Sequence, residues 1–353
     1  MNLKYDITFH PSWWHKYAGV DFTQEFFDDP EYRMEADLKM KKALYEHFGE
    51  FGLGEKEPVK RPLLGTNFLA AGYLYSELMG CEIKYEEDNS PQVVCMNLDE
   101  DEIEQIQKPD LDKNPVWQRT QKQIDYLLEK YGRVESHVNL MGIQNIAMDI
   151  MGQDVMVAYY SAPDEVRELM QKITDMSIEI GKRFYSLSKD ISGGVTAIVQ
   201  QVAPGNYLTS NCSVEMVSNQ IYEEFLLDYD TQLAKAFPNF GIHHCGKTME
   251  HVVEGYRKVP NLKFAEVGAF SDIRRVREVL PDVFLNARYS PVRLGKASED
   301  EVMTEVRDLI AGGMNPAGQV SISCVGLDSN VADEQIRYFL KACQTVAKEV
   351  ADK

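Results

Sequence analysis

The sequence predicts an α/β protein, specifically a somewhat irregular (β/α)8 barrel of the TIM type. The first observation is that short apolar runs alternate with longer amphipathic runs through the C-terminal half, which is typical of parallel strands linked by helices. The second is that seven strand candidates are recognisable in the 353 residues, and one irregular or missed strand would complete eight. The third is that polar residues follow several of these runs, where parallel α/β folds place their sites. A doubly wound open sheet is the alternative, with sites at the same strand ends.

The expected strands are short runs rich in apolar and β-branched residues. They cover residues 63–68, 135–141, 195–199, 240–243, 262–267, 283–287 and 319–323. Amphipathic runs predict helices at residues 163–188, 214–235, through 249–253, and at 271–280, 298–311 and 331–348. Ser271 or Asp272 is the expected N-cap of one of these helices, and Ser298 caps another because Glu299 and Asp300 follow it in the first turn.

Two segments do not fit this alternation. Residues 1–60 are rich in aromatic residues, and we expect an N-terminal extension that covers one barrel end or walls a substrate pocket, with packing as the simpler role. Residues from about 80 to 115 are acidic, and we expect an excursion from the barrel, such as a hairpin. No linker divides the chain, so residues 1–353 are interpreted as a single domain.

Composition limits the partners. The formal net charge of −19 argues against nucleic acid and anionic membranes, since both need a basic face. The chain has no apolar run of the roughly 20 residues that a membrane span requires, and its first residues lack the apolar core of a signal peptide. The six cysteines are scattered and do not resemble a disulfide framework. These features predict a protein of the reducing cytoplasm.

The most informative motif is His243-His244-Cys245, which ends an apolar run. In a strand, residues two apart point the same way, so His243 and Cys245 can reach one point while His244 faces the opposite side. Cys324 ends another such run. One imidazole and two thiolates suit tetrahedral Zn²⁺ and leave a fourth position for substrate. Buried cysteines that only fill space are the simpler interpretation.

These residues, with the sequence around them, resemble the uroporphyrinogen decarboxylase superfamily, in particular its zinc-dependent methyltransferase branch. The resemblance implies a (β/α) barrel in which His243, Cys245 and Cys324 bind zinc, and methyl exchange with the cobalt of a separate corrinoid protein. The decarboxylases themselves carry an N-terminal arginine-rich segment that binds tetrapyrrole carboxylates. Residues 115–119 (Pro-Val-Trp-Gln-Arg) are only a fragment of it and lie too far along the chain. This departure favours the methyltransferases.

Further candidates follow other expected strands. Glu266 is the candidate catalytic residue, as a proton donor to the leaving group; a fourth zinc ligand or a salt bridge within the barrel are its other roles. Arg288 could hold a substrate carboxylate, although structural pairing is the simpler role. Cys212, at the start of an expected helix, is interpreted as a packed thiol. The remaining substrate-binding candidates are Gln200, Gln201, Asn211 and Tyr289.

Taken with the resemblance, these residues predict a zinc-dependent methyltransferase that acts with a corrinoid protein. The expected small substrates are phenyl methyl ethers, methanol or methylamines, and the aromatic N-terminal segment favours an apolar donor. The alternatives are methyl transfer from a methylcorrinoid to a thiol, tetrapyrrole decarboxylation, and a non-catalytic zinc-stabilised binding protein. A homodimer is one arrangement that the sequence leaves open.

Overall fold

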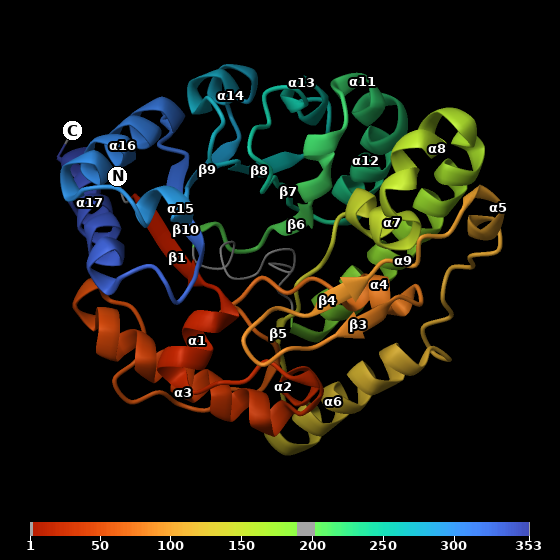
Figure 1. Ribbon diagram of the computed structural model, residues 1–353, viewed down its shortest axis with the longest axis horizontal. Coiled ribbons are helices and arrows are strands. Elements are labelled where there is room, and N and C mark those ends of the chain that lie inside the picture. Colours follow the sequence, from red (N-terminus) through yellow and green to blue (C-terminus); the bar gives the residue numbers. More distant parts are fainter. Residues whose placement is uncertain (1–2, 189–201, 353) are drawn as a thin grey trace.

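The protein is an α/β fold built around a curled parallel sheet (Figure 1). The computed structural model describes residues 3–188 and 202–352. Its main sheet has six parallel strands in the order β1-β10-β9-β8-β7-β6. Their bounds are β1 Lys4–Phe9, β6 Tyr207–Ser210, β7 Phe240–His243, β8 Leu262–Val267, β9 Phe284–Tyr289 and β10 Val320–Leu327. Strands β2 (Leu63–Gly65) and β5 (Glu135–His137) form a separate parallel pair.

The pair β2-β5 is tied to the free edge of β6 through the chain that follows β5. Asn145 donates a hydrogen bond to the Ser210 carbonyl (2.9 Å), and the Ser210 hydroxyl donates to the Leu140 carbonyl (3.3 Å). These bonds hold the segment after β5 against the C-terminal end of β6. The expected α/β class with a parallel, curled sheet is therefore confirmed.

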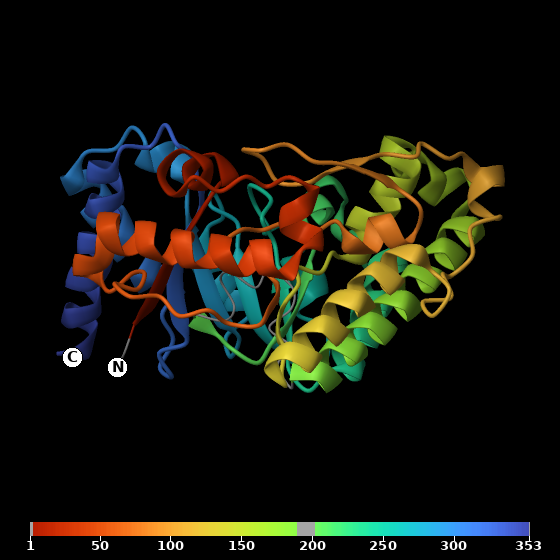
Figure 2. The same ribbon diagram turned by 90° about the horizontal axis from the view of Figure 1, so that it is seen from below.

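Helices cover the outside of the sheets (Figures 1 and 2). In Figure 2, β1 begins beside α17, and the Tyr5 side chain on β1 hydrogen-bonds Gln344 of that helix. The α-helices are α1 Pro11–Ala18, α2 Gln24–Asp28, α3 Pro30–Phe48, α4 Leu74–Leu78, α5 Glu100–Ile103, α6 Pro115–Tyr131, α7 Ile143–Met151, α8 Val155–Ser161, α9 Pro163–Ser188, α11 Asn219–Ile221, α12 Leu227–Ala236, α13 Val253–Tyr256, α14 Ile273–Val279, α15 Pro291–Leu294, α16 Glu299–Gly313 and α17 Asp333–Ala351. Short 3₁₀ turns are η1 Gly49–Phe51, η2 Gly152–Asp154 and η3 Cys212–Met216, and η4 Tyr222–Leu226 is a π-helix.

Several predicted elements are confirmed with their caps. Strands β7 and β8 and helix α9 have the predicted bounds. Asp272 caps α14 by accepting from the Arg274 and Arg275 amides, and Ser298 forms a capping box with Glu301 at α16. The predicted helix over 214–235 is wrong as one element, because η3, α11, η4 and α12 divide it.

The strand list needs two additions. β1 and β6 were not predicted, and the predicted strand at 195–199 lies outside the described residues. β1 pairs with β10, so the main sheet includes residues of the aromatic N-terminal segment. The aromatic side chains after β1 pack together: the Trp13 ring lies 4.1 Å from that of Phe9 and 4.9 Å from that of Trp14, and both tryptophans are buried. Packing therefore accounts for these two tryptophans.

The acidic segment begins with an antiparallel hairpin, β3 (Glu82–Lys84) and β4 (Gln92–Val94). Its chain then returns to the body of the molecule, where the Met96 and Leu98 amides donate to carbonyls of α7. Within the described residues, no helix has the length and apolar character that crossing a membrane would take.

Candidate metal centre

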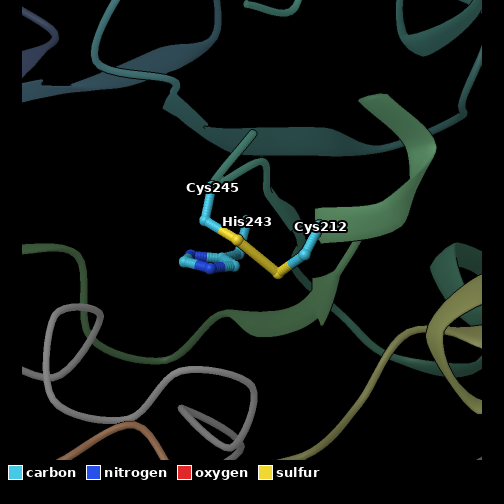
Figure 3. Close-up of side chains that lie close together, drawn as sticks. All are labelled: Cys212, His243 and Cys245. Carbon is cyan, nitrogen blue, oxygen red and sulfur yellow. A yellow bond between two sulfur atoms is a disulfide. The ribbon is translucent and has the colours of Figure 1, made fainter. Parts of the chain in front are cut away.

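Cys212, His243 and Cys245 converge at the C-terminal ends of β6 and β7 (Figure 3). The two strands pair in parallel with Ser210 opposite His243, so the chain leaves both strands at the same level. Cys212 opens the 3₁₀ turn after β6, and Cys245 lies two residues beyond the end of β7. The sulfur and imidazole nitrogen atoms of the three side chains all lie within 4.8 Å of one another. That spacing allows one ion to contact all three.

In the structure the sulfur atoms of Cys212 and Cys245 are joined as a disulfide, with the two Cα atoms 5.0 Å apart (Figure 3). The sequence analysis did not expect a disulfide. The same convergence that suits a shared metal also brings two thiols within bonding distance, so the two arrangements compete for the same sulfur atoms. Because thiolates are the metal-binding form, metal binding requires this bond to be reduced.

Glu266 fixes the orientation of the His243 ring. Its carboxylate contacts His243 Nδ1, which leaves Nε2 as the ring nitrogen available to a metal. The other carboxylate oxygen lies 3.3 Å from Arg288 Nε. Burial opposes ionisation of Glu266, but the neighbouring charges of His243 and Arg288 outweigh it and hold the pKa of Glu266 below its usual range. An ionised carboxylate orients His243 well but is a poor proton donor, so the structure favours the salt-bridge role foreseen as an alternative.

His244 points to the opposite side of β7 from His243 and Cys245, as predicted. It is fully buried, with Nε2 3.0 Å from the Thr248 carbonyl and Nδ1 2.8 Å from the Tyr256 hydroxyl. A carbonyl only accepts, so Nε2 carries the proton and Nδ1 accepts from Tyr256. Burial lowers the pKa of His244 to about 4 and keeps the ring neutral.

The expected third ligand, Cys324, is not part of this group, and Cys212 stands in its place. The sheet register explains the difference. His243 aligns with Glu266, Glu266 with Asn286, and Asn286 with Ser321, so these four side chains share the inner face. Cys324 is three residues beyond Ser321 and therefore faces outward. It is fully buried there, near Cys343 of α17, and burial raises its pKa to about 12.

The same alternation places the other candidates. Arg288, two residues beyond Asn286, faces inward, whereas Tyr289 faces outward and donates to Glu305 of α16. Tyr289 therefore does not reach the site. Asn211 also points away, because its amide donates to Asp230 of α12 (2.7 Å). Gln200 and Gln201 lie outside the described residues.

A cavity of about 420 Å³ lies beside the three converging side chains. Cys212, His243, Cys245 and Arg288 supply part of its lining, and Leu140 and Met141 part of its apolar wall. Arg288 Nη1 is buried and has no hydrogen-bond partner among the described residues. The ion pair with Glu266 involves a different atom of the guanidinium, Nε. The cavity thus combines candidate metal ligands, an apolar wall and a guanidinium with unused donor capacity.

The sequence profile of the uroporphyrinogen decarboxylase (URO-D) family matches residues 72–346, which is most of the chain. The chain belongs to the uroporphyrinogen decarboxylase family. The family assignment made from the HxC motif is thereby confirmed. No protein in a search of curated sequences matches the chain.

Solved structures with a similar fold include a methyltransferase from Methanosarcina mazei (TM-score 0.67, 15% identity), with 98% of this chain and 94% of that chain covered. A B12-independent methionine synthase from Shewanella sp. W3-18-1, in complex with selenomethionine, has a TM-score of 0.53 at 9% identity, with 100% and 98% covered. A putative vitamin-B12 independent methionine synthase from Listeria monocytogenes has a TM-score of 0.50 at 13% identity, with 98% and 96% covered. At these identities the likeness concerns the fold.

Cys212 is the candidate ligand that the sequence did not reveal: it was interpreted as a packed thiol, and the structure brings it together with His243 and Cys245. The signal that could have identified it is its place two residues beyond the short strand β6, the same offset that Cys245 has from β7. That signal depends on recognising residues 207–210 as a strand.

Proposed function

We propose that this member of the uroporphyrinogen decarboxylase family is a zinc-dependent methyltransferase. It would move a methyl group between a small methylated compound and the cobalt of a corrinoid protein. The observation that carries the proposal is the convergence of Cys212, His243 and Cys245 on a cavity at the C-terminal strand ends. Three ligands of this kind leave a position open for substrate, as catalytic zinc sites do.

The proposal includes a complete barrel. The six-stranded sheet and the pair β2-β5 together supply eight parallel strands, the number that a TIM barrel has. In this interpretation β5 adjoins β6 and β2 adjoins β1, and the candidate site occupies the C-terminal mouth. The hydrogen bonds between Ser210 and the segment after β5 support the first of these junctions.

The donor set fits zinc once the disulfide is reduced. Cys212 and Cys245 would bind as thiolates and His243 through Nε2, while Glu266 holds Nδ1 and keeps the ring oriented. When bound, zinc would supply Lewis acidity toward the heteroatom that carries the methyl group. Two thiolates would offset the charge of the metal and the Glu266–Arg288 pair adds no net charge, so a neutral or singly charged substrate could enter without strong repulsion.

The cavity walls suggest how the substrate is held. Leu140 and Met141 suit the apolar part of a methyl donor such as a phenyl methyl ether. Arg288 pairs with Glu266 through Nε, and its Nη1, which has no hydrogen-bond partner among the described residues, could bind a polar or anionic substituent. The aromatic wall once expected from Trp13 and Trp14 is not part of the proposal, since these rings are buried in packing.

The test is a spectroscopic assay of methyl transfer. Reduced, zinc-loaded protein is mixed with a corrinoid protein in the cob(I)alamin state and with methoxybenzene, methanol or methylamine in turn. Conversion to methylcobalamin with at least one donor is the expected result. Cys245→Ser should abolish it, and Cys324→Ser, which alters a cysteine on the outer face, should not.

Other outcomes would support other functions. Coproporphyrinogen formation from uroporphyrinogen without a corrinoid would establish a decarboxylase. Demethylation of methylcobalamin only when a thiol is supplied would establish transfer to a thiol. Zinc binding with no turnover of any of these compounds would leave a non-catalytic binding protein.

A further inference from the structure

The two chain segments that carry the candidate metal ligands share a second contact, on the side away from the cavity. Asn211 precedes Cys212, and His244 lies between His243 and Cys245, so each segment turns one polar side chain outward. Both side chains reach one buried group of residues behind the strands. We call it the buried polar cluster; its members are Asn211, Tyr222, Asp230, His244 and Tyr256.

Hydrogen bonds connect the cluster from one segment to the other. The Asn211 amide donates to Asp230 Oδ2 (2.7 Å), and the Tyr222 hydroxyl donates to the same oxygen (2.7 Å). The Tyr256 hydroxyl lies 2.8 Å from His244 Nδ1 and is also hydrogen-bonded to the Asn211 side chain. A continuous chain of polar contacts therefore runs from the segment of Cys212 to the segment of Cys245.

The cluster is buried, and Tyr222, Asp230 and Tyr256 belong to elements that contribute no candidate ligand. Tyr222, Tyr256 and His244 have no exposed surface, and Asp230 is 3% exposed. Tyr222 and Tyr256 also pack edge to face, with ring centroids 5.0 Å apart. Such a network fixes the groups that it joins, because breaking one bond leaves a buried polar atom without a partner.

We propose that the buried polar cluster positions Cys212 and Cys245 against each other, with Tyr256 and Asp230 as positioning residues. The backbone bond from the Asn211 amide to the His243 carbonyl (2.8 Å) also joins the two ligand segments, and it fixes their spacing but not the direction of the side chains. The cluster fixes the outward side chains on both segments, and strand alternation then directs the cysteines inward. Its role in metal binding rests on the proposed function, whereas the positioning itself does not.

A metal-free experiment tests the positioning. Metal-free protein is equilibrated with oxidised and reduced glutathione, and the fraction of chains with a Cys212–Cys245 bond is measured by alkylation and mass spectrometry. In this reaction two protein thiols are oxidised to one disulfide and one glutathione disulfide is reduced to two thiols. The equilibrium constant measures how well the folded chain holds the two sulfur atoms together.

Tyr256→Phe removes one oxygen atom and leaves the ring in place. We expect the equilibrium constant to fall about tenfold, because the hydroxyl's hydrogen bonds to His244 and Asn211 are both lost. Tyr222→Phe should cause a smaller fall of about threefold, since Asn211 still binds Asp230. The control is Tyr289→Phe, which removes a hydroxyl that donates to Glu305 of α16; Tyr289 is buried on the outer face of β9, a strand that carries no candidate ligand. The same constant for Tyr256→Phe, Tyr289→Phe and the unaltered protein would overturn the proposal.

Metal affinity separates this inference from the proposed function. If the unaltered reduced protein binds zinc, Tyr256→Phe should weaken binding about tenfold and change the absorption spectrum of the cobalt(II)-substituted protein, whereas Tyr289→Phe should change neither. If the unaltered protein binds no zinc, but Tyr256→Phe still lowers the glutathione constant, the proposed function fails and the positioning stands. If the unaltered protein binds zinc but Tyr256→Phe changes neither measurement, the positioning proposal fails and the zinc site of the proposed function stands.

Discussion

Cys245 follows strand β7 and Cys324 lies within strand β10, and the two cysteines are on opposite faces of the sheet. Cys245 follows His243 by two residues, is exposed, and stays on the inner face beside the cavity. Cys324 lies three residues beyond Ser321, is fully buried, and faces α17. The comparison teaches that one residue of register separates a candidate metal ligand from a packed thiol.

The largest expected effect is the difference in zinc affinity between serine variants of the two cysteines. Cys245→Ser removes one of three thiolate or imidazole ligands, and we expect zinc affinity to fall at least about a thousandfold. Cys324→Ser should leave affinity within about threefold, since its side chain does not reach the site. Competition with a chromogenic chelator measures both. Equal losses from the two variants would mean that Cys324 does bind the metal and that the inner and outer faces are misassigned.

The next largest effect concerns the inner face beside β10. Asp6 of β1 aligns with Ser323, is buried, and accepts a hydrogen bond from the Ile7 amide (2.9 Å). Burial raises the pKa of Asp6 to about 8. Between about pH 4 and 8 the unfolded chain therefore loses a proton that the folded chain keeps, and stability falls as the pH rises.

Asp6→Asn should remove this fall, so that the variant gains roughly 3 to 4 kcal/mol over the unaltered protein between pH 5 and pH 8. Denaturant midpoints at the two pH values measure it. Asp308→Asn is the matched control, because Arg274 lowers the pKa of this exposed carboxylate and its contribution has the opposite sign. A constant difference between Asp6→Asn and the unaltered protein across this range would show that Asp6 is ionised in the fold.

The smallest expected effect tests whether the charge of Glu266, which contacts His243, strengthens metal binding. Glu266→Gln keeps the shape of the side chain but removes its charge, and zinc affinity should fall about tenfold. Glu305→Gln serves as the control, because Glu305 pairs with Arg293 and accepts from Tyr289 on the outer face. Chelator competition again gives the affinities. An unchanged affinity in Glu266→Gln would mean that the charge of Glu266 does not support the site, and a loss in Glu305→Gln would point to a general effect of removing a paired carboxylate.

Local signals allowed much of the C-terminal half to be predicted from the sequence. The run at 262–267 is apolar enough to identify β8, and Asp272 and Ser298 supply side-chain caps that place the starts of α14 and α16. β6 is harder, since Tyr207–Ser210 ends in two hydroxyl residues and is only four residues long. Without it, Cys212 could not be placed at a strand end.

The facing of Cys324 could not be predicted for a different reason. The sequence of β10 is apolar or small at nearly every position, so no alternation of polar and apolar residues marks its inner face. Which alternate residues of β10 face inward is set by pairing with β9, where Ser321 aligns with Asn286. The spacing of residues along one strand cannot predict how that strand aligns with a strand far away in the sequence.

The π-helical turn η4 has a consequence for the length of the chain between Tyr222 and Asp230. An α-helix advances 100° per residue, so residues eight apart would point about 80° away from each other. A π-helical turn takes up about one extra residue, which brings the two directions to within about 20°. Tyr222 and Asp230 can therefore share a hydrogen bond although they are eight residues apart. Deleting a single residue from 223–226 would restore a regular helix with the two partners seven residues apart and still within about 20° of each other, whereas inserting a residue would rotate them by about 100°, so this stretch should tolerate a one-residue deletion far better than an insertion.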